Sequence, residues 1–279
     1  MKRARLSKAL SYVLLALGAV VMVLPMVYMF TTSLRSNDAT FSWPPRIFPT
    51  GSDLTFANYR YVLSEQNFVG YLSNTLFVAV VTTLATAVVA SMLAYCIARL
   101  EFHGRRLLYG TIITTMLVPG LAMLVPQFEL AVTFKLVDDL WGVIFFYSAW
   151  MTPFSTFLIK GFIDTIPREL DEAVRIDGGS IYTIFFRVIV PLASPSIAAV
   201  SIFNFLLPFE ELGWSQTILK TDALRTMPVA ITMFFQAHNR TDWGFVFAMT
   251  CCAMVPVILL YVLLQRYFIT GLTSGAIKG

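Results

Sequence analysis

The sequence YLSNTLFVAVVTTLATAVVASMLAYCIA fills residues 71–98 and contains no Asp, Glu, Lys or Arg. A helix needs about 20 mostly apolar residues to cross a bilayer core of roughly 30 Å. The stretch exceeds this requirement, so it predicts a membrane-spanning helix.

Five further stretches meet the same requirement, at residues 9–31, 107–130, 140–159, 190–212 and 244–265. The chain of 279 residues is 57% hydrophobic and only 13% charged, whereas a soluble protein carries about a quarter charged residues. This composition excludes a cytosolic globular enzyme, a disordered chain and a nucleic-acid binder. We therefore expect an all-α membrane protein with six transmembrane helices, forming a single transmembrane domain over residues 1–279.

Basic residues set the expected orientation. With a cytoplasmic N-terminus, the inner segments hold 13 Lys and Arg, and the longer outer segments hold 7. Basic residues gather on the cytoplasmic side of membrane proteins, so both termini are expected in the cytoplasm. Lys2, Arg3, Arg5 and Lys8 precede the first span, whose apolar run is too long for a signal peptide and is followed by no A-x-A site. We therefore expect a retained helix.

No motif in the sequence carries catalysis or metal binding. Cys96, Cys251 and Cys252 lie in or beside apolar runs, without a CxxC or a His/Cys cluster. His103 and His238 are expected on opposite sides of the membrane. The phosphate-binding pattern G-x-x-x-x-G-K-[ST] and the nucleophile pattern G-x-S-x-G are both missing. We therefore expect no catalytic residue, no metal and no cofactor on this chain, which is then not itself an enzyme.

The loop between the fourth and fifth spans reads PRELDEAVRIDGGSIYTIFFRVIVP over residues 167–191. Pro167 is tolerated in the first turn of a helix. The acidic residues that follow it lie at the positive end of the helix dipole. Gly178 and Gly179 allow the helix to end and the chain to turn. The loop predicts a short cytoplasmic helix, although spacing alone fits an ordinary solvated connector equally well.

This loop resembles the EAA motif of bacterial ABC importer permeases. That motif is Glu-Ala-Ala, three residues, Gly, nine residues and Ile-x-Leu-Pro, and residues 172–191 follow its spacing with conservative changes. The run Arg175-Ile176-Asp177-Gly178 resembles the carbohydrate-uptake branch, in particular its maltose-type second permease subunit. The likeness extends over essentially the whole chain, including YCIARLEFHGRR at residues 95–106 and the tail at residues 268–279.

The resemblance implies a place in a larger assembly. Such a permease pairs with a second permease subunit as a heterodimer in the bacterial inner membrane. Two ATPase subunits hold ATP and Mg, and an extracytoplasmic solute-binding protein delivers the sugar substrate. Residues 167–191 would hold the coupling helix, which lies in a groove of the ATPase, with Glu172 paired to a basic group and Ala173 allowing close docking. The implied ATPase-coupling residues are Glu172, Ala173, Val174, Arg175, Asp177, Gly178 and Gly179.

The end of the fifth span departs from the family. Where the family tends to have Trp-Asn-Asp/Glu-Phe, this chain has Phe209-Glu210-Glu211-Leu212. A carboxylate at membrane depth is costly unless it meets water or a partner. One hypothesis gives Glu210 or Glu211 hydrogen bonds from sugar hydroxyls or an amino sugar, and the other leaves both solvated or bonded to loop amides. Asn204 is a further candidate on the substrate pathway, and the two acids favour a neutral or amino sugar over an anionic one.

Other classes of protein fit the sequence less well than a sugar permease. Within the same class, the solute is alternatively a polyol, a glycerol-phosphate or a peptide. A secondary transporter driven by an ion gradient would favour ionisable residues near span centres and repeated halves, and neither is visible in the sequence. A membrane enzyme such as a lipid-sugar transferase should show an acidic or His site at a membrane face, and none is seen.

Overall fold

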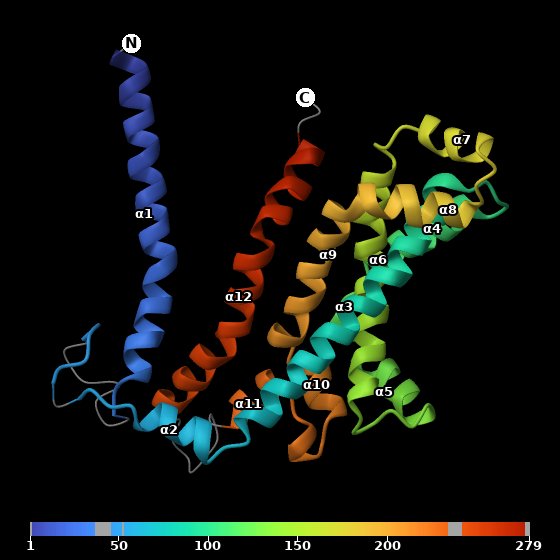
Figure 1. Cartoon of the computed structure of the whole chain (residues 1–279). Coiled ribbons are helices and arrows are strands. Elements are labelled where there is room, and N and C mark those ends of the chain that lie inside the picture. The colour runs from blue at the N-terminus through green and yellow to red at the C-terminus, as the bar shows by residue number, and fades with distance from the viewer. Residues whose placement is uncertain (1, 37–45, 52, 234–241, 277–279) are drawn as a thin grey trace. The chain divides into compact units, whose positions relative to one another are not determined.

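The computed structural model describes residues 2–36, 46–51, 53–233 and 242–276 (Figure 1). His238 therefore lies outside the described residues. Within the described ranges every regular element is helical, and one isolated β-bridge joins Arg35 to Leu54. The protein is all-α, as its composition predicts.

The chain forms two compact units. Unit 1 comprises Met1–Val69 and Ala230–Val255, and unit 2 comprises Gly70–Val229 and Pro256–Gly279. The helices α3 (Phe68–Arg99), α11 (Met227–Met233) and α12 (Trp243–Ala276) each run from one unit into the other. Each unit is described below by itself.

Unit 1 holds α1 (Lys2–Ser33) and α2 (Ala57–Ser64). The buried side-chain amide of Asn58 on α2 donates to the carbonyl oxygens of Ser33, at 2.8 Å, and Arg35, at 2.7 Å. The first bond satisfies a carbonyl group that the end of α1 leaves without a helical partner, and the second holds the residue two positions beyond the helix. The most apolar window of α1 has no residue buried within the chain.

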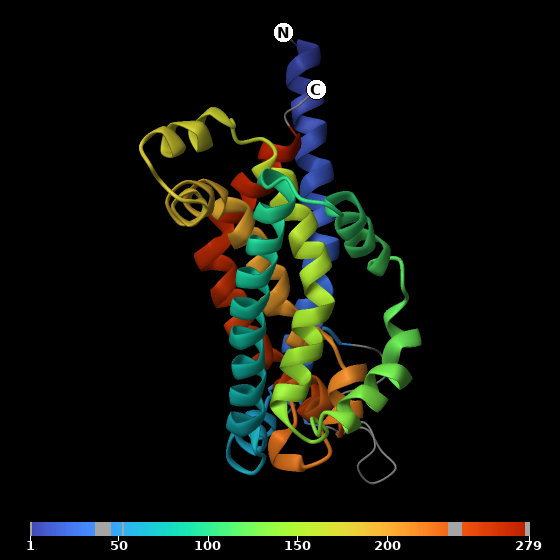
Figure 2. The ribbon, with the colours of Figure 1, turned by 90° about the vertical axis from the view of Figure 1, so that its right-hand side faces the viewer.

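Unit 2 contains most of the remaining helices. In chain order they are α4 (Arg105–Thr115), η2 (Gly120–Met123), α5 (Leu124–Thr133), α6 (Leu140–Ile163), α7 (Glu169–Ile176), α8 (Ile181–Ile184), the π-helical turn η3 (Phe185–Ile189), α9 (Val190–Glu210), α10 (Gly213–Ile218) and η4 (Asp222–Leu224). Figures 1 and 2 show α7 and α8 at one end of this unit and α5 and α10 at the other.

The core of unit 2 lies where α3, α6 and α9 pack together. One buried cluster includes Ala94, Ile163 and Ala193, at the end that carries α7 and α8. A second cluster, at the opposite end, includes Val78 and Val143. The small side chains Ala94 and Ala193 allow close approach of the helices, which is how helices pack when lipid is as apolar as the core.

The third predicted span is broken in the structure. The axes of α4 and the η2–α5 segment meet at 100°, a bend that Figure 2 shows clearly. Pro119 lacks a backbone N–H and disfavours helical geometry at Val118, and its own backbone is extended, with ψ 128°. The apolar stretch predicted at residues 107–130 is therefore two helices around a bend and not one continuous helix.

The other five predicted stretches coincide with long apolar helices. Five helices among the described residues are long and apolar enough to cross a membrane, and the bent pair makes six if it counts as one span. The fifth of the predicted stretches begins earlier than expected, because α8, η3 and α9 form one continuous run over Ile181–Glu210. The chain is a multi-pass membrane protein.

Candidate functional site

The helix α7 ends in a turn that requires glycine. Gly178 has φ 80°, a left-handed conformation that costs glycine little because it has no β-carbon. The amide of Gly178 donates to the carbonyl oxygen of Arg175 at 3.0 Å, and that of Gly179 donates to Val174 at 2.8 Å. These two bonds form the Schellman pattern that closes helices. The glycine pair thus ends the helix, as the sequence predicts.

Most of the predicted coupling residues are exposed on α7 and its end. Exposed are Glu172, Ala173, Arg175, Asp177 and Gly178, whereas Val174 and Gly179 are half-buried. Sequence reasoning missed Ile176, which is 86% exposed. The sequence did offer a signal for its exposure, because Ile176 stands between the charged residues Arg175 and Asp177. The exposed surface therefore combines charges with one large apolar side chain.

A polar cavity of about 350 Å³ lies where α7 meets the carboxyl end of α3. Its walls are Arg99, Leu100, Glu101, Arg168, Asp171, Glu172 and Arg175. Three arginines and three acids make its charge balanced overall. Two neighbouring acids of α7 line this cavity. Glu172 is exposed, whereas Asp171 is buried.

The three predicted pathway residues have different surroundings. The side chain of Asn204 is fully buried, and its amide nitrogen lies 3.3 Å from the hydroxyl of Ser155 on α6. Glu210 is exposed at the end of α9. Glu211 accepts hydrogen bonds from the backbone amides of Trp214, at 2.8 Å, and Ser215, at 3.3 Å. Glu211 is thus bonded to the amides of the first turn of α10, an arrangement similar to the bonding to loop amides that was one of the two alternatives.

Two cavities lie along the bend between α4 and α5. One, of about 330 Å³, is lined by Gly120, Leu121, Leu124, Gln127, Phe146, Tyr147, Trp150, Leu207, Glu211 and Trp214. The other, of about 690 Å³, shares Gly120, Gln127 and Trp150 with it. Aromatic walls with a few polar groups are typical of small-molecule sites. Sequence reasoning missed Trp150 and Gln127, because only the bend brings their helices to one cavity.

Tyr147 on α6 lines the first of these cavities and bonds to Glu211 and to Ser215 on α10. Its hydroxyl donates to the carboxylate of Glu211 and lies 2.7 Å from the hydroxyl of Ser215. A buried tyrosine usually has a hydrogen-bond partner for its hydroxyl. The wall at α6 and α10 is therefore fixed by a polar network.

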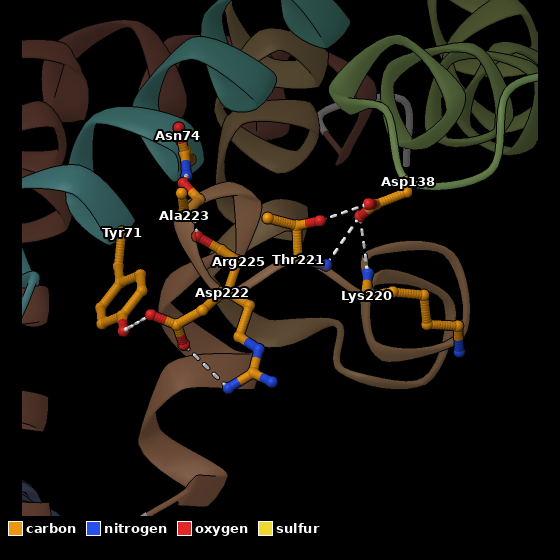
Figure 3. Close-up of polar contacts among 8 residues, drawn as sticks. All are labelled: Tyr71, Asn74, Asp138, Lys220, Thr221, Asp222, Ala223 and Arg225. Carbon is orange, nitrogen blue, oxygen red and sulfur yellow. Dashed lines mark hydrogen bonds and ion pairs between the residues drawn. The ribbon is translucent and has the colours of Figure 1, made fainter.

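A second polar network holds the loop between α10 and α11 (Figure 3). Asp138 has φ 60°, and its carboxylate accepts the backbone amides of Lys220 and Thr221, both at 2.8 Å, and the hydroxyl of Thr221, at 2.5 Å. Hydrogen bonds from the Thr221 side chain and these amides hold the pKa of Asp138 below its ordinary value. These hydrogen bonds are solvent-exposed, so the loop that they hold forms part of the protein surface.

The same loop is also held by the amino-terminal turns of α3. The hydroxyl of Tyr71 donates to the carboxylate of Asp222 at 3.0 Å, and the amide of Asn74 donates to the carbonyl oxygens of Ala223, at 2.8 Å, and Arg225, at 3.0 Å. Figure 3 shows the loop held from both sides. It is therefore fixed in one conformation against α3.

These features define the class of the protein: an all-α, multi-pass membrane protein with a short exposed helix between two long apolar helices. Residues 87–274 match the family described as "Binding-protein-dependent transport system inner membrane component". The chain belongs to this family.

Relatives match the chain along nearly its whole length. The Trehalose/maltose transport system permease protein MalG of Thermococcus litoralis is 30% identical over 98% of this chain and 99% of the relative. The Diacetylchitobiose uptake system permease protein DasC of Streptomyces coelicolor is 30% identical over 92% of both. The Melibiose/raffinose/stachyose import permease protein MelC of Bacillus subtilis is 32% identical over 95% of both.

A solved structure has the same fold. It is a bacterial ABC transporter involved in the import of the acidic polysaccharide alginate, and its matching chain has a TM-score of 0.83 at 22% identity. The match covers 96% of this chain and 98% of that one. The two chains therefore share one fold along nearly their whole length.

Proposed function

We propose that this chain is one of two permease subunits of an ATP-driven sugar importer in a bacterial inner membrane. The observation that carries the proposal is its similarity, over nearly the full length of both chains, to permeases named for the uptake of trehalose, maltose, diacetylchitobiose and melibiose. These relatives support a sugar as the solute, and the exposed surface of α7 supports the proposed route of coupling.

Both termini and α7 lie in the cytoplasm in this proposal, and the bent pair counts as the third of six spans. The exposed face of α7 contacts an ATPase, which supplies the ATP and Mg sites, so the chain is not itself an enzyme. Glu172 pairs with a basic group of the ATPase and Ala173 permits close docking. Val174, Arg175, Asp177 and the glycine pair complete the contact, and Ile176 adds an apolar anchor to it.

The opposite end of unit 2 faces the solute-binding protein. The loop held by Asp138, Tyr71 and Asn74 lies there, and its fixed conformation suits a docking surface because little order is lost on binding. The second permease subunit completes the pathway.

The sugar passes along the cavities at the bend. Trp150 offers an aromatic surface and Gln127 an amide, a combination that matches the apolar faces and hydroxyl edges of a sugar. Asn204, Glu210 and Glu211 remain the proposed pathway residues. Of these, Glu211 lines a cavity wall and Glu210 is exposed, whereas Asn204 acts by holding α6 against α9.

A second candidate is a permease for a related solute that is not a simple sugar. A relative 31% identical to this chain is the Sulfoquinovosyl glycerol transport system permease protein SmoH of Agrobacterium fabrum. Uptake assays with sugars, polyols, peptides and glycerol-phosphates would separate the two candidates.

The test is co-purification from native membranes in mild detergent, followed by identification of partners and an ATPase assay. We expect an ATPase, a second permease and a solute-binding protein, with ATPase recruitment lost in Glu172→Lys. Glu65→Lys, an exposed acid of unit 1, is the matched control and should retain all partners. A chain that purifies alone, with uptake abolished by a protonophore, would indicate an ion-driven transporter instead.

A further inference from the structure

The last two turns of α3 carry two buried polar residues, Tyr95 and Arg99. Tyr95 and Arg99 are four residues apart and lie on one face of the helix. They are only 5% and 7% exposed. A buried arginine is costly unless paired, so its partners indicate what it holds.

Arg99 joins three elements of unit 2. Its Nε lies 3.3 Å from Oδ2 of Asp171 in the first turn of α7, and the two side chains are 4% and 9% exposed. Its Nη2 donates to the carbonyl oxygens of Ile163, at 3.2 Å, and Ile166, at 2.7 Å. Ile163 is the last residue of α6 and Ile166 lies in the turn just beyond it, and the carboxyl end of a helix favours a cation. The start of α7 is thereby attached to α3.

Tyr95 makes the corresponding attachment to the segment that follows α7 in the chain. Its hydroxyl donates to the carbonyl oxygen of Ile181 at 3.1 Å, and its ring lies 5.2 Å from that of Phe185, between centroids. Ile181 and Phe185 belong to α8 and η3, which follow the glycine turn. Two residues one helical turn apart on α3 therefore hold the chain on both sides of α7.

The other end of α3 holds the loop between α10 and α11 through Tyr71 and Asn74, as Figure 3 shows. This loop is called the outer loop below. At 1.5 Å per residue, the helix from Tyr71 to Arg99 is about 40 Å long. One straight element therefore contacts both the short cytoplasmic helix and the loop at the opposite end of unit 2.

We infer that α3 is a rod that links α7 to the outer loop, with Arg99 and Tyr95 as positioning residues at its cytoplasmic end. The inference rests on the proposed function, in which α7 contacts an ATPase and the outer loop faces a solute-binding protein. When the solute-binding protein docks on the outer loop, α3 transmits the effect and biases the position of α7. This route acts in addition to the covalent connections of α7 to α6 and α9. A buried ion pair moves as a unit because separating it leaves an uncompensated charge.

The test uses the complete complex in nanodiscs. ATP hydrolysis is measured with and without the sugar-loaded binding protein for Asp171→Asn, Arg99→Lys and Tyr95→Phe. We expect each variant to keep its partners and its basal ATPase rate, and stimulation by the binding protein to fall about fivefold. Arg106→Lys on α4, an exposed arginine on the same side, should be stimulated normally. Tyr95→Phe removes one hydroxyl, so it remains informative if the arginine variant fails to fold.

A distance measurement separates positioning from a purely structural role. In a background without the native cysteines, spin labels at Glu169 on α7, an exposed residue outside the proposed ATPase contact, and Val88 on α3 should keep one distance in the nucleotide-free and ATP-bound states. In Asp171→Asn the distance should change with nucleotide. Equal stimulation of all variants, or a wild-type distance that changes with ATP, overturns the inference alone. A wild-type chain that recruits no ATPase overturns the proposed function as well.

Discussion

Gly120 lies directly against the indole of Trp150, so that a β-carbon on Gly120 would be 1.5 Å from Cη2 of the ring. Gly120 follows the proline that breaks the third span, and Trp150 lies on α6. Both residues line both cavities at the bend. The contact therefore sets how closely the broken span approaches α6, and with it the shape of the proposed sugar pathway.

Replacing Gly120 with Ala should displace the indole and disturb both cavities. Forcing an extra methyl group into a packed contact costs about 1–3 kcal/mol, so Gly120→Ala should unfold at a lower temperature and lose most sugar uptake. Thermal unfolding in detergent and uptake in proteoliposomes would measure these effects. Gly110→Ala on α4 is the matched control, because nothing lies within 4 Å of a β-carbon there. Normal uptake by Gly120→Ala would show that the close contact is unimportant.

The sequence predicted the apolar helices well because their signal is local. A long run without charges, as in residues 71–98, permits little except a membrane helix. The turn at Gly178 was predictable for the same reason, since two adjacent glycines after an acidic amphipathic segment favour a helix end. Five stretches therefore match long apolar helices, and a short helix, α7, lies where the loop predicts one.

The features that sequence reasoning missed depend on contacts between distant segments. Pro119 was visible, but a proline inside an apolar run fits either a kinked helix or a full break. Trp150 and Gln127 looked like ordinary span residues until the bend brought them to one cavity. The predicted roles of Glu210 and Glu211 were left open in the sequence, and only the fold shows that the second carboxylate is bonded to the amides of α10.

Gly178→Ala should weaken coupling without a steric clash. Nothing lies within 4 Å of a β-carbon at Gly178, so the effect is purely conformational. A left-handed backbone costs a residue other than glycine about 1–2 kcal/mol. We expect the end of α7 to shift and sugar-dependent ATP hydrolysis to fall several-fold, while the chain stays folded. Gly161→Ala on α6 has equally open space and ordinary helical geometry, and should behave as the wild type.

Glu211→Gln should destabilise the chain, whereas Glu210→Gln should not. The Glu211 carboxylate accepts two backbone amides and the Tyr147 hydroxyl, and an amide group keeps one acceptor oxygen in place of two charged ones. Loss of a hydrogen bond to a charged group costs about 1.5–3 kcal/mol. Thermal unfolding of the two variants side by side measures the difference.

Uptake by the same two variants tests the pathway. Glu210 is exposed, so its substitution should reduce sugar uptake without changing assembly or unfolding temperature. Wild-type uptake by Glu210→Gln would remove that residue from the proposed pathway. Equal unfolding temperatures for both variants would contradict the structural role assigned to Glu211.

Asp138 should make the loop between α10 and α11 sensitive to acid. Its pKa is lowered from the ordinary value of 3.8 by hydrogen bonds from Thr221 and Lys220. A group whose pKa is lower in the folded state contributes stability that is complete above 3.8 and disappears as the pH falls through the folded value. Because the site is exposed, the contribution is small, about 1 kcal/mol. Asp138→Asn keeps a residue that tolerates the left-handed backbone, and it removes the charge and one of the two acceptor oxygens.

The measurement is the unfolding temperature of the purified chain as a function of pH. The wild type should be more stable than Asp138→Asn at pH 7, and the two curves should converge as the pH falls below 3.8. Glu65→Gln, which changes an exposed acid with no side-chain bond among the described residues, should follow the wild type throughout. A difference between wild type and Asp138→Asn that persists unchanged into strong acid would mean that the charge of Asp138 does not hold the loop.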